Sequence, residues 1–162
     1  TSQEFRMLEN CKTAKERWGG VSEIIDRWLE ERQTMLVQYC ALSGATEVLT
    51  DTVRESKLRE FCQILVDYVS AGHFGVYDQL IKEGREFDDV EGLQQAASLY
   101  DIVDQTTERL LDFNDKYLET DDLTTLTDDL SLLGEAMEVR FSAEDRLVSI
   151  LHTSHKDLVT QD

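Results

Sequence analysis

The chain of 162 residues contains no proline. A proline inside an α-helix removes a backbone hydrogen bond and clashes with the preceding turn, at a cost of roughly 3 kcal/mol. Nothing in this sequence therefore forces a helix to stop, and long uninterrupted helices are expected. Strand-type alternation, internal repeats and low-complexity linkers are absent from the sequence. These features predict an all-α fold.

Four long segments carry apolar residues at spacings of three and four, which is typical of helices with one buried face. The first two helices are expected at about 21–43 and 52–83, each followed by a glycine suited to end a helix. Asp88 or Asp89 is expected to cap the third helix, and residues 120–122 to cap the fourth. The expected buried positions are Val21, Ile24, Ile25, Trp28, Met35, Leu36, Tyr39 and Leu42 in the first helix; Cys62, Val66, Val69, His73, Val76 and Leu80 in the second; Leu93, Ala97, Tyr100, Val103, Leu111 and Leu118 in the third; and Leu123, Leu126, Leu130, Leu133, Met137, Phe141, Val148 and Leu151 in the fourth.

Short connections between long helices predict antiparallel neighbours. The expected architecture is a single helical domain over 1–162. Its core is an antiparallel up-and-down bundle of four long helices at 20–155, with a short extra N-terminal helix at 7–18 that holds Leu8, Ala14 and Trp18. Residues 1–6 are interpreted as a cloning remnant, because Met7 offers a natural start.

Ionisable side chains interrupt three of these apolar faces: Arg32, Asp67, His73, Arg140 and Glu144. Burying any one of them unpaired would cost several kcal/mol. Two arrangements avoid that cost. In one, the groups form an internal network that fixes helix register; in the other, they line a water-filled groove where a partner docks. Spacing alone does not choose between the two.

Composition limits the partners. The net charge of −18 is unfavourable for nucleic acid and for anionic membranes, and it attracts basic proteins. Three widely spaced cysteines without a CxxC motif indicate free thiols in a reducing compartment. With no basic-then-apolar leader and no apolar run long enough to span a bilayer, a cytoplasmic location is expected.

Motifs for catalysis or metal binding are weak. A di-iron bundle needs Glu-x-x-His pairs, and none of the three histidines has an acid three residues before it. Ser70 and His73 lack a nucleophile-elbow context, and no glycine-rich phosphate loop is present. The acids Glu135, Glu138 and Asp145 are expected on a solvated helix face. We therefore expect no enzyme, no metal and no cofactor. The alternative function is a small-molecule- or metal-sensing helical bundle that uses a polar cavity between helices.

Three blocks resemble one family of bacterial regulators. IDRWLEERQTMLVQY at 25–39, FCQILVDYVSAGHFGVYDQL at 61–80 and GEAMEVRFSAEDRLVSILH at 134–152 are together similar to the Rsd/AlgQ family of anti-sigma regulators. The segment MLENCKTAKERWGG at 7–20 resembles the AlgQ branch, which implies alginate regulation. The resemblance covers nearly the whole chain from Met7 onward and is looser between about residues 83 and 129.

The resemblance implies an anti-sigma factor that binds region 4 of the housekeeping sigma factor of RNA polymerase, a basic helix-turn-helix module. In the family the DYxSAGHF block contributes to the sigma-binding surface, which here implies Asp67, Ser70 and Phe74. Facing positions in the predicted helices extend that surface to Tyr77, Arg32 and Glu144. His73 and Arg140 are assigned instead to a structural polar network.

Overall fold

The computed structural model describes residues 3–10, 23–43 and 51–153. Within these ranges the chain is helical apart from short turns and contains no β-strand, so the predicted all-α fold is confirmed. Residues 3–10 form a short helix. The later elements are α2 (Glu23–Ser43), α3 (Asp51–Ala71), the π-helical turn η1 (Gly72–Val76), α4 (Tyr77–Glu86), α5 (Val90–Glu119), α6 (Leu126–Val148) and the π-helical turn η2 (Ser149–Thr153).

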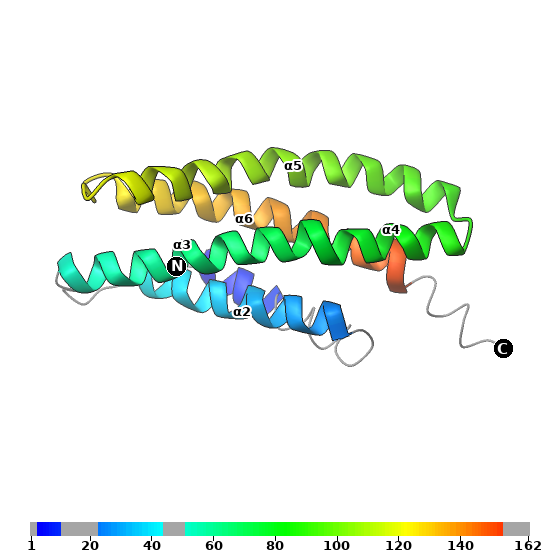
Figure 1. Ribbon diagram of the computed structural model, residues 1–162, viewed down its shortest axis with the longest axis horizontal. Coiled ribbons are helices and arrows are strands. Elements are labelled where there is room, and N and C mark those ends of the chain that lie inside the picture. Colours follow the sequence, from blue (N-terminus) through cyan, green and yellow to red (C-terminus); the bar gives the residue numbers. More distant parts are fainter. Residues whose placement is uncertain (1–2, 11–22, 44–50, 154–162) are drawn as a thin grey trace.

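The long helices lie side by side along the long axis of the molecule (Figure 1). Helices α3, η1 and α4 follow one another as a single rod, and the chain reverses direction at the turns between α4 and α5 and between α5 and α6. Helix α5 packs against α6 and α3, and α2 packs against α3 and α6. This arrangement brings side chains from α2, α3, α5 and α6 to a shared interior.

The apolar faces predicted for the first and last helices agree with the structure. In α2 the buried side chains include Ile25, Trp28, Met35 and Tyr39, although Ile24 is 43% exposed. The third expected face is right in part: Val103 is buried, and Leu93 and Tyr100 are half-buried. Ala97, Leu111 and Leu118 are exposed, and the buried apolar side chains of α5 are instead Ala96, Leu99, Val103, Leu110, Phe113 and Tyr117. Alanine and leucine also occupy solvent-facing positions of helices, so apolar identity alone did not fix this face.

The π turn η1 changes the register of the second rod. Hydrogen bonds from residue i to i+5 insert about one extra residue into a helical turn, which rotates the following helix by roughly 100°. Before the turn the buried positions include Leu65 and Val69, within it Gly72 and Val76, and after it Tyr77 and Leu80. The prediction that His73 lies on the core stripe is therefore wrong. It assumed an unbroken α-helical period, and His73 is exposed.

Helix α4 does not end at Gly84 as expected. Its backbone instead closes with a Schellman arrangement, in which the Asp89 amide donates to the Gly84 carbonyl and the Asp88 amide donates to the Arg85 carbonyl. Asp88 takes the left-handed conformation, with φ of 49°. The Asp89 side chain then accepts a hydrogen bond from the Gly92 amide and caps α5, as predicted. Helix α6 begins at Leu126, four residues after the last cap expected for it.

Several expectations concern residues outside the described ranges: Ala14 and Trp18 of the short N-terminal helix, Val21 and Gly44 at the ends of the first long helix, and Cys11 among the cysteines. Met7, within the described part, is buried in the core. The thiols of Cys40 and Cys62 are free, and burial raises the pKa of Cys62 to about 11. None of the described helices combines the length and apolar character needed to cross a membrane.

Candidate partner-binding surface and buried polar network

A single carboxylate lies at the centre of the interior. Glu144 on α6 is fully buried. Its Oε1 accepts a hydrogen bond from the Tyr68 hydroxyl at 2.7 Å, and its Oε2 accepts one from the Tyr77 hydroxyl at 2.5 Å. The two tyrosines come from α3 and from the first position of α4, so Glu144 joins the two sides of the η1 turn to α6.

Two buried arginines neutralise this carboxylate. Arg140 lies one helical turn before Glu144, with Nε 3.4 Å from Oε2, and Arg32 on α2 approaches Oε1 with Nη2 at 3.5 Å. Arg140 also donates from Nη1 to the Thr107 hydroxyl at 2.8 Å and from Nη2 to the Tyr77 hydroxyl at 3.1 Å. The guanidinium groups thereby tie α2 and α5 to the same centre.

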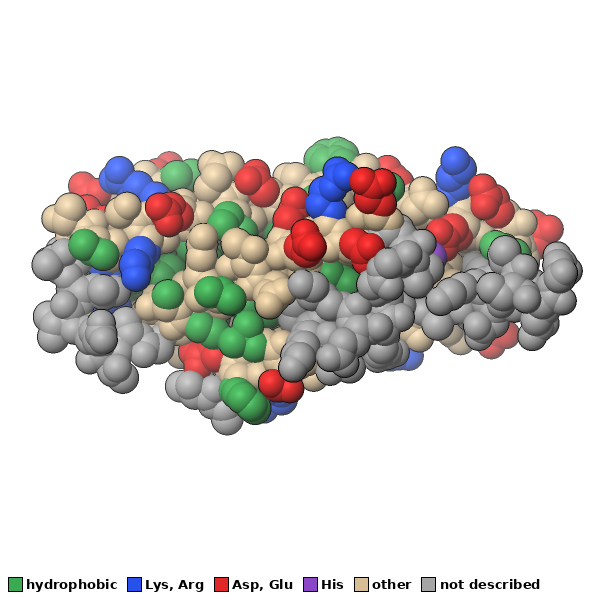
Figure 2. All heavy atoms as spheres, turned by 90° about the horizontal axis from the view of Figure 1, so that it is seen from below, with side chains coloured by type: hydrophobic (Ala, Val, Ile, Leu, Met, Phe, Trp, Pro, Cys, Tyr) green, Lys and Arg blue, Asp and Glu red, His purple; other side chains and the backbone are tan. Residues whose placement is uncertain are grey.

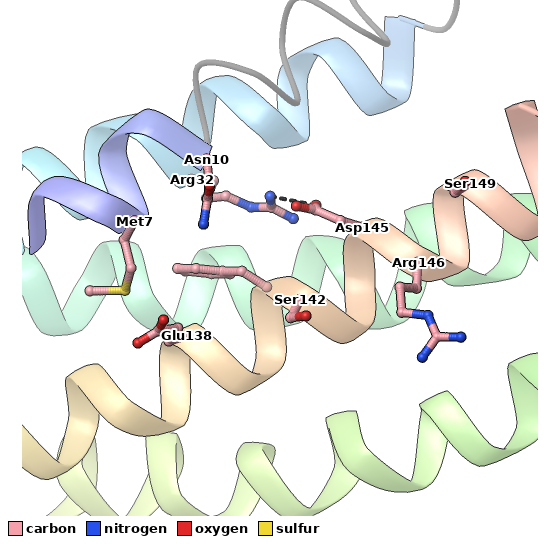
Figure 3. Close-up of a pocket in the computed structure, with 9 residues that line it drawn as sticks. Met7, Asn10, Arg32, Glu138, Ser142, Asp145, Arg146 and Ser149 are labelled. Carbon is pink, nitrogen blue, oxygen red and sulfur yellow. Dashed lines mark hydrogen bonds and ion pairs between the residues drawn. The ribbon is translucent and has the colours of Figure 1, made fainter. Parts of the chain in front are cut away.

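The guanidinium group of Arg32 makes both hydrogen bonds and aromatic contacts. Its Nε donates to the Tyr68 hydroxyl at 2.9 Å and its Nη1 to Asp145 at 2.7 Å. The guanidinium carbon also lies 4.8 Å from the ring centroids of both Trp28 and Phe141, a double cation–π contact. Figure 3 shows Arg32 reaching from α2 to Asp145 on α6.

The electrostatics of the network favour charged arginines and neutral tyrosines. Burial alone would lower the pKa of Arg32, but Tyr68, Asp145 and Glu144 outweigh it and raise that pKa well above its ordinary value. Burial raises the pKa of Tyr68 and of Tyr77, and the charge of Glu144 raises both further. The side chains of Arg32, Arg140, Glu144 and Asp145 balance in charge, which offsets the cost of removing them from water.

Of the two arrangements that the sequence left open, an internal network and a groove lined by charges, these four charged side chains form the internal network. Arg32, Tyr77 and Glu144 are 1%, 5% and 0% exposed, so their predicted place on a partner-binding surface is wrong. They face one another across the packed helices instead of facing solvent. Arg140 lies in this network, whereas His73, which was assigned to it, lies outside on the surface.

Arg140 Nη1 also donates to the Thr106 hydroxyl at 3.2 Å. Sequence reasoning missed four members of the network: Tyr68, Thr106, Thr107 and Asp145. Asp145 was expected on a solvated face, but its carboxylate binds Arg32. Glu138, from the same expected face, binds Arg6 of the short N-terminal helix at 2.7 Å, whereas Glu135 is exposed as predicted. The only available signal was the adjacency of Asp145 to Glu144, which does not reveal an arginine arriving from a distant helix.

The remaining predicted contact residues lie on the outer surface of α3 and η1. Asp67 is exposed and accepts a hydrogen bond from Gln63 one turn away, and Ser70 is half-buried. Phe74 is 77% exposed, the largest exposed fraction among the large hydrophobic side chains of the described residues. The ring of His73 meets it edge-to-face at 4.9 Å. The π turn thus presents an aromatic ring to solvent.

A groove separates this surface from α2, and we call it the α2–α3 groove. Its apolar end, of about 330 Å³, is lined by Ile24, Arg27, Trp28, Glu31, Ala71, Phe74, Gly75 and Val76. Its acidic end, of about 270 Å³, is lined by Arg27, Glu30, Glu31, Thr34, Ile64 and Asp67. Arg27 and Glu31 line both hollows, so the two ends adjoin.

A separate cavity of about 320 Å³ lies where the short N-terminal helix, α2 and α6 meet, and we call it the Arg32 cavity. Figure 3 shows the side chains that line it: Met7, Asn10, Arg32, Glu138, Phe141, Ser142, Asp145, Arg146 and Ser149. Charges of both signs face this space. No group of three or more His, Cys, Asp or Glu side chains within the described ranges is placed to hold a metal ion.

Comparison with known proteins gives one consistent result. Residues 7–152 match the family model described as regulator of RNA polymerase sigma(70) subunit, Rsd/AlgQ. Proteins named Regulator of sigma D from Salmonella newport and Salmonella typhimurium are each 36% identical to this chain over 160 residues. Each alignment covers 93% of this chain and 95% of the relative.

Proposed function

The chain belongs to the Rsd/AlgQ family of regulators of the RNA polymerase sigma(70) subunit, and on that basis we propose that it binds region 4 of the housekeeping sigma factor and blocks its use by RNA polymerase. It acts as a stoichiometric inhibitor without turnover, in the cytoplasm where the polymerase works. The contact surface consists of Asp67, Ser70 and Phe74.

The observation that carries this assignment is the exposure of Phe74. A phenylalanine 77% exposed on a helix loses the stabilisation that burial of its ring would give. Aromatic side chains, phenylalanine included, are enriched in protein interfaces. Asp67 and Ser70 lie on the same rod within two turns of it, and they add a charge and a hydroxyl for polar contacts.

The surface charge supports a basic partner. Acidic side chains are spread over the face shown in Figure 2 and outnumber the basic ones among them. The net charge of −18 attracts a basic helix-turn-helix module and speeds its encounter in a salt-dependent way.

The test is a calorimetric titration of sigma region 4 with single-site variants. Asp67→Ala and Phe74→Ala are each expected to weaken binding by about 1–3 kcal/mol, because each removes a central contact. Leu118→Ala is the matched control: Leu118 is 68% exposed on α5, outside the proposed surface.

Thermal melts run beside the titration separate binding from stability. Both Asp67→Ala and Phe74→Ala should melt within a few degrees of the parent, because both side chains are exposed. Affinities equal to that of Leu118→Ala would refute the assignment. A lower melting temperature in proportion to the lost affinity would instead assign the two residues a structural role.

We also propose the detailed helix arrangement and the biological process. The helix lengths and order support an antiparallel up-and-down bundle of four long helices with a short N-terminal extra helix. The similarity of residues 7–20 to the AlgQ branch supports a role in alginate regulation.

The alternative role, sensing a small molecule, has a candidate location in the Arg32 cavity, because a buried guanidinium and the two serines Ser142 and Ser149 line it. A ligand-dependent rise in melting temperature that Arg146→Ala abolishes would support this role.

A further inference from the structure

The two ends of the α2–α3 groove differ in chemistry. On α2, Ile24 lies at the apolar end and Glu31 seven residues later reaches the acidic end. On the opposite wall Phe74 lies at the apolar end and Asp67 at the acidic end, again seven residues apart. Seven residues of helix rise about 10 Å. The groove therefore offers an apolar hollow and an acidic hollow about two helical turns apart.

Glu31 is incompletely satisfied in the folded protein. Its Oε2 is shielded from solvent, and no donor among the described residues forms a hydrogen bond with it. Burial, and next the negative charge of Asp67, raise the pKa of Glu31. The nearby cation Arg27 acts in the opposite direction on that pKa without outweighing burial and Asp67, and it forms an ion pair with Glu23 at 3.3 Å. A buried acceptor without a donor costs free energy, and a cation from outside the chain would remove that cost.

We infer that the α2–α3 groove receives one face of a partner α-helix, whose arginine binds between Glu31 and Asp67 while an apolar side chain of the same helix fills the Ile24–Phe74 end. This inference rests on the proposed function, and it assigns the part of the sigma factor that docks. Charge complementarity carries it, because an acidic hollow adjoins an apolar one, with Glu31 and Asp67 at the acidic end and Ile24 and Phe74 at the apolar end.

Arginine fits the acidic end better than lysine. Its planar guanidinium carries five donors and can bridge two carboxylates at once, whereas an ammonium group is a compact point charge. The apolar side chain and the arginine of the partner helix must lie one to two turns apart, because the arginine side chain spans part of the separation of about 10 Å. One arginine of the partner helix would then bind both Glu31 on α2 and Asp67 on α3.

The central variant is Glu31→Gln, which keeps the shape of the side chain and removes its charge. Its affinity for sigma region 4 is expected to fall at least about tenfold, in the range for loss of one partner of a close charge pair. Its melting temperature should equal or exceed that of the parent, because the folded protein disfavours the charge of Glu31. Glu31→Gln thus lowers the affinity for region 4 without lowering the melting temperature. A purely structural role for Glu31 would lower both.

The matched control is Glu108→Gln. Glu108 is exposed on α5, so this change removes the same unit of charge from outside the groove. Ile24→Ala tests the apolar end in the same assay and should weaken binding several-fold. On the partner, each arginine of region 4 is replaced by alanine in turn. The arginine that meets Glu31 should weaken binding to the parent protein and have little further effect in the Glu31→Gln background.

Each outcome decides something. If the parent and Glu108→Gln bind region 4 while Glu31→Gln binds equally well, the groove inference is wrong and the proposed function stands. If no arginine of region 4 couples to Glu31, the inference is likewise overturned. If the parent chain does not bind region 4 at all, the proposed function fails and the inference fails with it.

Discussion

At the scale of single residues, Glu144 holds together the polar interior. One carboxylate with no exposure receives two tyrosine hydroxyls and lies beside two guanidinium groups. Every partner comes from a different part of the chain except Arg140, which is four residues away. Removing the charge would leave Arg32 paired only with the half-buried Asp145, and it would remove the carboxylate that pairs with Arg140.

We predict that Glu144→Gln lowers the free energy of unfolding by about 3–5 kcal/mol, the usual cost of breaking a buried ion pair by removing one partner. Urea denaturation followed by circular dichroism measures this change. Glu135→Gln on the same helix is the control, because Glu135 is exposed and its replacement should change stability by less than about 0.5 kcal/mol. Equal unfolding midpoints for the two variants would contradict the role assigned to Glu144.

At the scale of elements, the π turn η1 decides which residues face inward. It buries Gly72 against the Tyr77 hydroxyl and turns His73 and Phe74 outward. A Cβ at Gly72 would lie 3.1 Å from the Tyr77 hydroxyl oxygen and 3.4 Å from Nε1 of Trp28. The same turn also contains Gly75, where an added Cβ meets no atom within 4 Å.

These two glycines form a matched pair for a test. Gly72→Ala is predicted to destabilise the protein by about 1–3 kcal/mol, because the new methyl group displaces the tyrosine that binds Glu144. Gly75→Ala should be neutral or stabilising by up to about 1 kcal/mol, because alanine favours helix and the site is open. Unfolding curves of the two variants give the comparison, and the reverse order of stability would show that η1 is packed differently.

At the scale of the whole molecule, all five tyrosines favour the neutral form. Burial is the largest cause of the raised pKa for each of them: Tyr39, Tyr68, Tyr77, Tyr100 and Tyr117, the last with a pKa of about 12. In the unfolded chain a tyrosine ionises near pH 10. Protons are therefore lost first by the unfolded state, and the contribution of these groups to stability is complete below that pH.

We predict that stability falls steeply as the pH rises above about 10, because the unfolded tyrosines ionise there while the folded ones do not. Thermal melts in a series of alkaline buffers measure the fall. Tyrosinate absorbance should appear together with the loss of helical circular dichroism, in one transition. Tyrosinate forming below about pH 10 in a fully helical protein would contradict the packing of these rings.

The sequence by itself determined the helices, because an apolar period of 3.6 residues and the lack of proline are local properties of the chain. It also marked Arg32, Arg140 and Glu144 as polar residues on apolar faces, and Phe74 with Asp67 as a surface pair through the resemblance to a family. These inferences need only neighbours within one or two turns, or a pattern shared with relatives.

Only the tertiary structure decided which of these residues meet. Nothing local to Asp145 shows that Arg32, 113 residues earlier, will bind it. Likewise, the π-helical turn η1 depends on tertiary packing, because it places Tyr77 against Glu144 and leaves His73 exposed to solvent. The spacing of apolar residues does not reveal that a π turn inserts one residue into the helix. A buried polar network forms only where several helices bring charged side chains to the same place. For that reason the sequence identified several of the polar residues of the interior, whereas the tertiary structure determined which residues they bind.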